Sequence, residues 1–161
     1  MNPLDDLYQD LLLEHKRRPR NYGRLQCAHH GATGHNPLCG DTVSLQVAER
    51  DGSVAEIAFE GEGCAICIAS ASLLTEAVKG RPVAAAKQLS AAMHELLTQE
   101  GPPQEAQQAA LGKLAALQGV RRFPSRIKCA MLAWRALDQC LNADAPASVD
   151  AEDGSHARVT S

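Results

Sequence analysis

Two alternating runs joined by a turn sequence constrain the fold of this chain more than any other feature. Val43, Leu45 and Val47 alternate with polar residues, and residues 55–59 repeat the pattern with Ala, Ile and Phe. Such alternation is typical of β-strands, in which residues two apart share one face. Asp51-Gly52 lies between the runs and favours a tight hairpin turn. The sequence therefore predicts an antiparallel hairpin, whose two outer ends meet.

Cysteines and a carboxylate stand at those outer ends. Cys39 and Asp41 precede the first strand, and Cys64 follows the second strand after Gly61 and Gly63. Because the two strands of a hairpin run antiparallel, these three side chains are expected at one edge of the sheet. The two glycines relax the backbone where it must approach a metal ion or a substrate closely.

Helical periodicity covers most of the remaining sequence, and segment 21–38 is expected to be a loop with at most one short strand. The predicted helices are residues 3–17, a helix that ends at Gly80, a helix opened by Pro82, a run at 104–118, and a last helix capped by Ser125. Residues 119–124 are expected to interrupt the helical structure before that last helix. A small antiparallel sheet with several helices packed on it indicates the α+β class.

Length and pattern predict one domain followed by a tail. The chain has 161 residues, which suits a single core. Residues 1–142 are predicted to form the domain. After Asn142 the apolar pattern is lost, and residues 143–161 are expected to be a disordered tail.

The net charge and the N-terminal sequence argue against nucleic acid and membranes as partners. The formal net charge is −3, which gives no general attraction for nucleic acid. The chain begins without a basic, apolar signal sequence, and no apolar stretch approaches the roughly 18 residues that span a bilayer. We expect a cytoplasmic protein without nucleic-acid or membrane partners. In that compartment the 6 cysteines are expected to be ligands or reactive thiols rather than disulfides.

The pairing of Cys39 with Asp41 makes chemical sense around a cation. A carboxylate so close to a thiol disfavours the thiolate, whereas a divalent cation reverses that effect and deprotonates the thiol. With Cys64 and Cys129, the set of three thiolates and one carboxylate forms a plausible four-coordinate metal site. Spacing alone leaves an equal alternative, in which Cys39 is a small buried side chain and Asp41 caps the turn. Cys129 lies near the start of the last helix, where backbone amides and the helix dipole favour a thiolate.

Other cysteines and histidines are weaker candidates. Cys64 and Cys67 form a C-x-x-C pair, which allows a redox pair or a substitute ligand, although a core thiol is favoured for Cys67. Cys27 and Cys140 have no partner pattern and are interpreted as partly buried free thiols. Three loop histidines rank below Asp41 as ligands: His29, His30 and His35.

Three motifs in order resemble the IscU/NifU-N iron–sulfur cluster assembly family over roughly residues 4–141. The motifs are residues 36–41 (NPLCGD), 61–72 (GEGCAICIASAS) and 123–130 (FPSRIKCA). Within the family the chain resembles the SufU branch. It has Lys128 where IscU-type scaffolds carry a histidine before the third cysteine, and it has the additional helical stretch, here about 82–118.

The resemblance implies an α+β fold and a zinc-dependent role in sulfur transfer. It implies that Cys39, Asp41, Cys64 and Cys129 bind Zn²⁺ tetrahedrally. It also implies that Cys39 accepts persulfide sulfur from a SufS-type cysteine desulfurase, an encounter at which Arg126 matters, while a desulfurase histidine replaces Cys39 on zinc. The sulfur then passes to an iron–sulfur scaffold or another acceptor, so the chain assists a desulfurase rather than acting as an enzyme alone.

Three alternatives remain at this point. The same ligands could hold a nascent [2Fe–2S] or [4Fe–4S] cluster, although a cluster site calls for a further exchangeable ligand, which Lys128 does not supply. A structural zinc domain that only mediates contacts is the second alternative. The third is a thiol oxidoreductase that uses Cys64 and Cys67.

Overall fold

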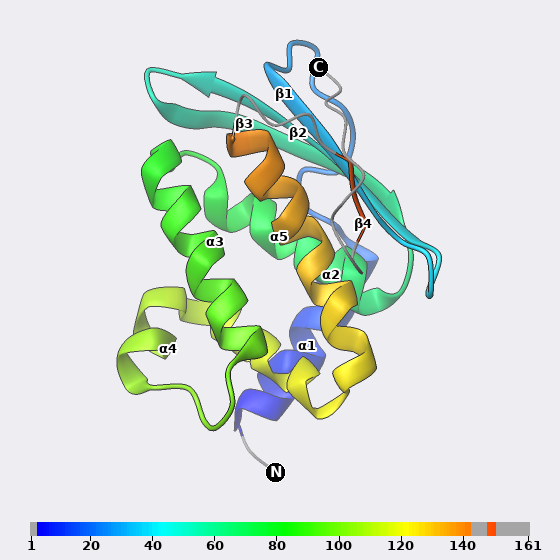
Figure 1. Cartoon of the computed structure of the whole chain (residues 1–161), viewed down its shortest axis with the longest axis vertical. Helices are drawn as coiled ribbons and strands as arrows, with labels where there is room; N and C mark the ends of the chain where they lie inside the picture. Colours follow the sequence, from blue (N-terminus) through cyan, green and yellow to red (C-terminus); the bar gives the residue numbers. More distant parts are fainter. Residues whose placement is uncertain (1–2, 143–147, 151–161) are drawn as a thin grey trace.

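The computed structural model describes residues 3–142 and 148–150. It shows a four-stranded sheet in the order β3-β2-β1-β4, with the helices gathered on one face and at one end (Figure 1). The elements are α1 (Pro3–Arg17), β1 (His30–Asn36), β2 (Asp41–Arg50), β3 (Ser53–Glu62), α2 (Ala65–Val78), α3 (Val83–Thr98), α4 (Glu105–Leu111), the 3₁₀ helices η1 (Gly112–Arg122) and η2 (Pro124–Arg126), α5 (Ile127–Leu141) and β4 (Ser148–Asp150).

The predicted hairpin is confirmed as β2 and β3. Val43, Leu45 and Val47 are buried, while the residues between them are half-exposed. Asp51 and Gly52 both have positive φ, 54° and 76°, as a two-residue turn that matches the twist of the strands requires. β1 adds a third antiparallel strand on the other side of β2, within the segment expected to be a loop with one short strand.

The helices that cover the sheet begin at or near two of the cysteines, Cys64 and Cys129. α5 packs across β1 and β2, and α2 packs against β3. Trp134 on α5 is fully buried and donates its Nε1–H to Ser70 Oγ at 3.1 Å, while Ser70 Oγ donates to the Ala130 carbonyl at 2.7 Å. Ser70 belongs to α2, so these bonds tie together the two helices that begin at or near Cys64 and Cys129.

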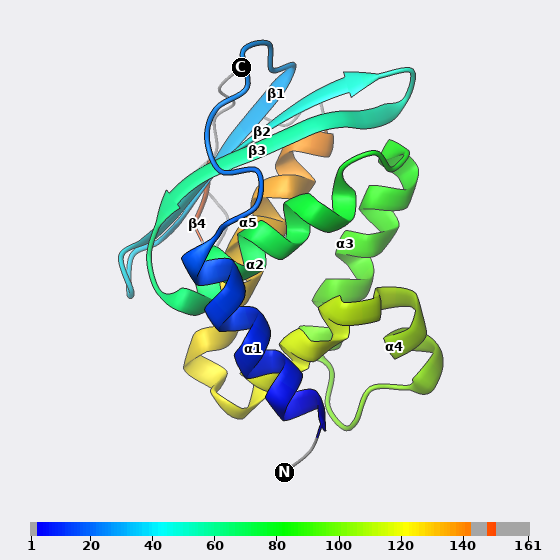
Figure 2. The same cartoon turned by 180° about the vertical axis from the view of Figure 1, so that it is seen from behind.

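No helix of the described residues covers the other face of the sheet (Figure 2). Figure 2 shows the segment between α1 and β1 passing alongside β3 and then over this face. Backbone bonds hold that segment in place: Gly23 N–H donates to the Phe59 carbonyl at 2.8 Å, and Phe59 N–H donates to the Asn21 carbonyl at 3.0 Å. The polar residues of β2 that alternate with its apolar ones face this side, which explains why the strand is two-sided.

Three sequence predictions in the region before α5 are wrong. The run 104–118 is an α-helix only over α4, and the predicted break at 119–124 is largely the end of η1. Gly112 has a φ of 58°, which ends the α-helix and begins the 3₁₀ turns. Ser125 does not cap α5, because it lies inside η2 and Arg126 occupies the N-cap position without a side-chain bond. A helical pattern of apolar residues does not separate α from 3₁₀ geometry.

The C-terminal region contributes one described strand. Residues 148–150 form β4, which pairs in parallel with β1 at Thr33–His35. The remainder of the stretch predicted to be a tail, 143–147 and 151–161, lies outside the described residues. None of the helices in the described part of the chain has both the length and the apolar character needed to cross a bilayer.

Candidate metal centre

Three donor atoms from distant parts of the sequence meet at one end of the sheet. The Sγ atoms of Cys39 and Cys129 and a carboxylate oxygen of Asp41 all lie within 4.8 Å of one another. Cys39 belongs to the loop between β1 and β2, Asp41 is the first residue of β2, and Cys129 is the third residue of α5. Packing of α5 across β1 and β2 therefore brings the third motif to the first.

Strand register brings Cys64 to the same place. Asn36 pairs with Asp41 across one hairpin, and Thr42 pairs with Glu62 across the other. Cys64 follows after Gly63 and is the N-cap of α2. Its backbone N–H donates to Asp41 Oδ1 at 3.0 Å, and its Sγ lies 3.7 Å from Asp41 Oδ2. Cys64 is thus beside the three-residue group, although it is not itself a member of it.

The two glycines before Cys64 are explained by close packing against the start of β2. Gly63 has a φ of 151°, and a Cβ at this position would overlap the carboxylate of Asp41. A Cβ at Gly61 would overlap the backbone carbonyl of Thr42. The close approach that the sequence predicted is therefore an approach to the Asp41 side chain and its strand.

Two of the distances between donor atoms match those around a tetrahedral zinc ion. Two sulfurs bound to such an ion at about 2.3 Å stand about 3.8 Å apart, and a sulfur and a carboxylate oxygen stand about 3.6 Å apart. The Sγ atoms of Cys129 and Cys39 are separated by 3.8 Å. Cys64 Sγ and Asp41 Oδ2 are separated by 3.7 Å. Thiolate and carboxylate donors fit zinc chemically as well.

The electrostatics of the group favour a cation. Burial raises the pKa of the Cys129 thiol, and hydrogen bonding to Asp41 and the nearby Cys64 raise it further. The stabilised thiolate expected at the start of α5 is therefore not obtained from the helix alone, because burial of the thiol and, after it, the Asp41 carboxylate outweigh the helix. A hydrogen bond to Cys129 raises the pKa of Arg126, with further contributions from the charges of the three thiols, Cys39 included. A divalent cation among these donors would offset their repulsion.

The two thiols that touch differ in exposure. Cys39 is exposed, and its neighbour Leu38 is 70% exposed, whereas Cys129 is fully buried. Gly40 has a φ of 72°, which turns the chain back into β2. Cys39 therefore lies in the loop before β2, as the sequence predicted, while Asp41 begins the strand. The two side chains converge nonetheless, because the loop folds over the end of the strand.

Asn36 is a buried polar residue at this site to which the sequence alone assigned no role. Its Nδ2–H donates to Cys129 Sγ at 3.9 Å, and its Oδ1 accepts the Leu38 N–H at 3.2 Å. Its backbone carbonyl accepts the N–H groups of Cys39 at 3.3 Å and Gly40 at 2.9 Å. The Asn-Pro pair signals the turn, but the contact across 93 positions to Cys129 has no sequence signal.

The remaining cysteines stand apart from the donor group. Cys67 is fully buried, and its backbone N–H donates to Cys64 Sγ at 3.4 Å. Burial raises the pKa of its thiol, with the charge of Asp41 adding to the effect. Burial also raises the pKa of Cys140 to about 12. These two are core thiols, while Cys27 is exposed rather than partly buried as predicted.

The three histidines that rank below Asp41 have other contacts. His29 Nδ1 accepts the Glu49 N–H at 2.9 Å, and His30 Nε2 lies 3.4 Å from a Glu49 carboxylate oxygen. His35 Nδ1 lies 3.0 Å from Thr42 Oγ1. In the described part of the chain none of them joins the Cys39 group.

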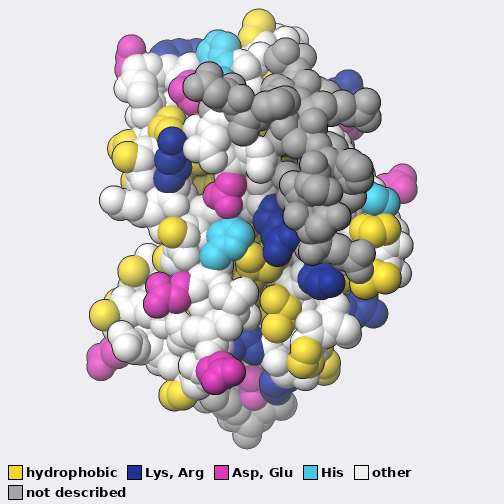
Figure 3. Space-filling view, viewed as in Figure 1, with side chains coloured by type: hydrophobic (Ala, Val, Ile, Leu, Met, Phe, Trp, Pro, Cys, Tyr) yellow, Lys and Arg dark blue, Asp and Glu magenta, His cyan; other side chains and the backbone are white. Residues whose placement is uncertain are grey.

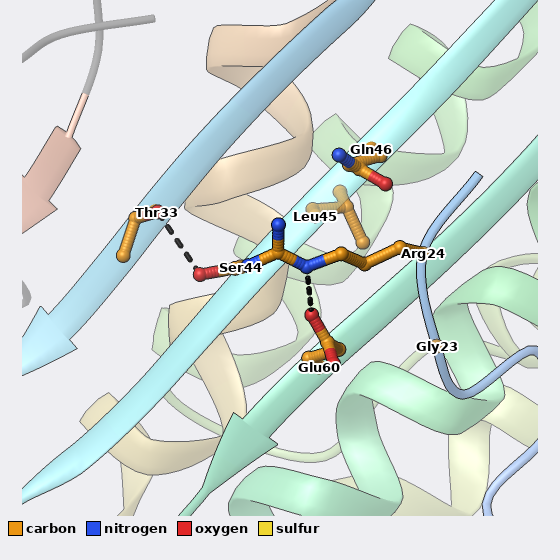
Figure 4. Close-up of a pocket in the computed structure, with 7 residues that line it drawn as sticks. All are labelled: Gly23, Arg24, Thr33, Ser44, Leu45, Gln46 and Glu60. Atoms are coloured by element: carbon orange, nitrogen blue, oxygen red, sulfur yellow. Dashed lines mark hydrogen bonds and ion pairs between the residues drawn. The ribbon is translucent and has the colours of Figure 1, made fainter. Parts of the chain in front are cut away.

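A polar cavity lies away from the donor group. Its volume is about 220 Å³, and Figure 4 shows the residues that line it, between the outer face of the sheet and the segment after α1. Arg24 Nε pairs there with Glu60 Oε1 at 2.6 Å, and Thr33 and Ser44 share a hydrogen bond of 3.0 Å. No thiol lines this cavity.

Positive charge accompanies the donor group along α5. Figure 3 shows Lys and Arg side chains gathered along this helix. The sequence places Arg126, Lys128 and Arg135 there, and Arg126 is exposed next to the thiols. Cationic side chains at the edge of a site attract anions such as thiolates and persulfides.

An exposed thiol, a buried thiol and a buried carboxylate on an α+β scaffold form a group that could hold a metal ion. The chain belongs to the NifU-like N-terminal domain family, whose model matches residues 7–140. The resemblance drawn from the three motifs is thereby confirmed, and so is the α+β fold. The family places this chain among the proteins of iron–sulfur cluster assembly.

Individual relatives cover nearly the whole described domain. The chain is 41% identical over 137 residues to the zinc-dependent sulfurtransferase SufU of Bacillus subtilis, covering 84% of this chain and 90% of the relative. It is 37% identical over 148 residues to the iron–sulfur cluster assembly scaffold protein IscU of Streptococcus pyogenes, covering 91% and 90%. Among solved structures, the N-terminal part of a nitrogen-fixing NifU-like protein from Brucella abortus superposes with a TM-score of 0.75 at 29% identity, covering 86% and 94%.

Proposed function

We propose that this chain is a zinc-dependent sulfur acceptor, which takes persulfide sulfur from a SufS-type cysteine desulfurase and passes it on for iron–sulfur cluster assembly. The observation that carries the proposal is the meeting of an exposed thiol, Cys39, with the buried donors Asp41 and Cys129. The similarity to a zinc-dependent sulfurtransferase supports it. Zn²⁺, held by these residues with Cys64, would keep the thiols deprotonated at neutral pH.

The residues of the chain supply the rest of the chemistry. Cys39, on an exposed loop, can reach the persulfide of a partner enzyme. Its thiolate attacks the terminal sulfur of that persulfide, a new S–S bond forms at Cys39, and the enzyme cysteine leaves as a thiolate. Arg126 is exposed beside the three thiols and can stabilise the anionic persulfide during the encounter. Asp41, Cys64 and Cys129 remain in the fold as the fixed part of the site.

A scaffold for a nascent iron–sulfur cluster is the second candidate. It is supported by the similarity to the scaffold protein of Streptococcus pyogenes and by the same set of thiols. Lys128 occupies the position directly before Cys129, and an ammonium group is not a cluster ligand. This residue favours sulfur transfer over cluster assembly.

One sample can decide between the two candidates. Protein purified without added metal is analysed for zinc and iron, and the same sample is added to a cysteine desulfurase with cysteine as substrate. We expect about one equivalent of zinc, faster desulfurase turnover, and a mass increase of one sulfur atom on the peptide that contains Cys39. Iron with a cluster absorption spectrum and unchanged turnover would instead establish the scaffold.

A further inference from the structure

We infer that Asn36 is a positioning residue that makes Cys129 a retained metal ligand and leaves the neighbouring Cys39 as the reactive thiol. Its side chain holds Cys129 as the retained ligand, while the same residue shapes the loop that presents Cys39 to a partner. This inference rests on the proposed function, because it explains which sulfur stays and which one reacts.

Because Asn36 is buried, its amide depends on hydrogen bonds within the protein. It is the last residue of β1 and only 1% of its surface is exposed. A buried amide must find partners for both its oxygen and its nitrogen, since leaving either without one is costly. The oxygen accepts the Leu38 N–H at 3.2 Å, and the nitrogen donates to Cys129 Sγ at 3.9 Å. At this length the N–H···S contact is weak to a neutral thiol and gains strength when the sulfur is charged.

The same residue organises the reactive loop. The bond from its Oδ1 to the N–H two positions on is the turn-forming pattern typical of asparagine. Its backbone carbonyl accepts the N–H groups of Cys39 and Gly40 at 3.3 Å and 2.9 Å. The place of Cys39 relative to Cys129 therefore depends on one side chain and its own carbonyl.

As a consequence, Cys129 and Cys39 differ in how firmly they are held and how readily they react, although their sulfurs are only 3.8 Å apart. An N–H donor fixes the direction of a ligand atom and draws charge from it, so Cys129 becomes the better-held ligand and the poorer nucleophile. Cys39 lies on the exposed side of the pair, on a loop whose backbone is fixed. Sulfur transfer requires this asymmetry, because a site that released Cys129 instead would open its buried side.

A purely turn-forming role can be separated from this one by two substitutions. Asn36→Asp keeps the shape of the side chain and the oxygen that accepts the Leu38 N–H, but it replaces the donor to Cys129 by an oxygen. Asn36→Ser also keeps an acceptor for the turn, adds no charge, and lacks the amide. Gln46→Glu, on the outer face of the sheet, is the control for the added charge, since it also keeps its acceptor for the Leu25 N–H.

The test measures zinc affinity and the site of labelling. Zinc dissociation constants are measured by chelator competition, and the peptides labelled first by limiting iodoacetamide are identified by mass spectrometry. Both Asn36 variants should bind zinc about 10-fold to 100-fold more weakly than the wild type. In Asn36→Ser, which adds no charge beside Cys129, the share of labelling on Cys129 relative to Cys39 should rise, with and without zinc. The unfolding midpoint of the metal-free protein should fall in both Asn36 variants, because a buried amide is lost, and Gln46→Glu should match the wild type in all three measurements.

The outcomes separate this inference from the proposed function. Wild-type protein that binds no zinc would refute the proposed function, and the labelling ratio of metal-free protein then decides the inference alone. Zinc affinity within twofold of the wild type together with an unchanged labelling ratio overturns the inference. A lower metal-free midpoint in both variants, with affinity and labelling unchanged, would assign Asn36 to the turn only and also overturn it. If Asn36→Ser does not fold, Asn36→Asp, which preserves the shape, decides.

Discussion

The donor group has an exposed side and a buried side, and they are built differently. The exposed side is loop 37–40, in which all four residues, Cys39 among them, are exposed. The buried side consists of Asp41 and Cys129, both fully buried, with the half-buried Cys64 next to them at the start of α2. Two hairpins and two helices position the buried side, whereas hydrogen bonds to one asparagine hold the loop. Under the proposed function, this difference would let the site keep a metal ion on its buried side while the exposed thiol reacts with a partner.

The largest effect should come from removing the exposed thiol. Cys39→Ala is expected to reduce desulfurase stimulation to the rate measured without this protein, because the acceptor of the sulfur atom is lost. Turnover of the desulfurase with cysteine provides the measurement. Cys27→Ala is the matched control, since Cys27 is an exposed thiol outside the donor group and its loss should leave stimulation intact. Full stimulation by Cys39→Ala would contradict the division into an exposed reactive side and a buried holding side.

Asp41 tests the buried side. Asp41→Ala should weaken zinc binding by more than about 100-fold, since even residues that only support a ligand change metal affinity by about 10- to 100-fold. Asp41→Asn keeps an oxygen for the Cys64 N–H and should preserve more of the fold while still losing a charged ligand. Chelator competition measures the affinity. Equal affinity for zinc in Asp41→Ala and the wild type would remove Asp41 from the ligand set.

A pair of glycine substitutions tests the packing behind Asp41. Gly63→Ala should lower the free energy of unfolding by at least about 1–3 kcal/mol, because it combines a strained backbone with overlap of the Asp41 carboxylate. Gly23→Ala is the control: Gly23 has a φ of 135° and nothing within 4 Å of the added carbon. Denaturant unfolding and zinc titration should separate them, with zinc binding weakened only in Gly63→Ala. Equal zinc affinity in both variants would show that the packing of Asp41 does not support the site.

The smallest effect on the metal is expected at Cys67. Cys67→Ser should leave zinc content unchanged, while the buried hydroxyl lowers the free energy of unfolding by about 1–3 kcal/mol. Metal analysis and denaturant unfolding on one preparation measure both. Loss of a full equivalent of zinc in folded protein would place Cys67 among the ligands instead of among the core thiols.

The sequence predicted the parts of the molecule that depend on neighbouring residues. Alternation from Val43 to Val47 and the Asp51-Gly52 turn predicted β2 and β3, and helical periodicity predicted α1 at its observed bounds. The same reasoning failed at residues 112–126, because α and 3₁₀ turns have similar apolar spacing over a short run and differ in whether each backbone hydrogen bond spans four or three residues. In this region the Tyr8 ring lies directly against Gly119, so packing by α1 contributes to the result.

The sequence by itself determined the types of donor and the family, since the three motifs with Cys39, Cys64 and Cys129 can be read without a structure. Only the tertiary structure decided that Cys39 is exposed and Cys129 buried, that their sulfurs stand 3.8 Å apart, and that Asn36 contacts Cys129. The physical reason is how far apart in the sequence the interacting residues lie. Turns and strand alternation follow from interactions within a few residues, whereas contacts across about 90 positions exist only once α5 has packed on the sheet.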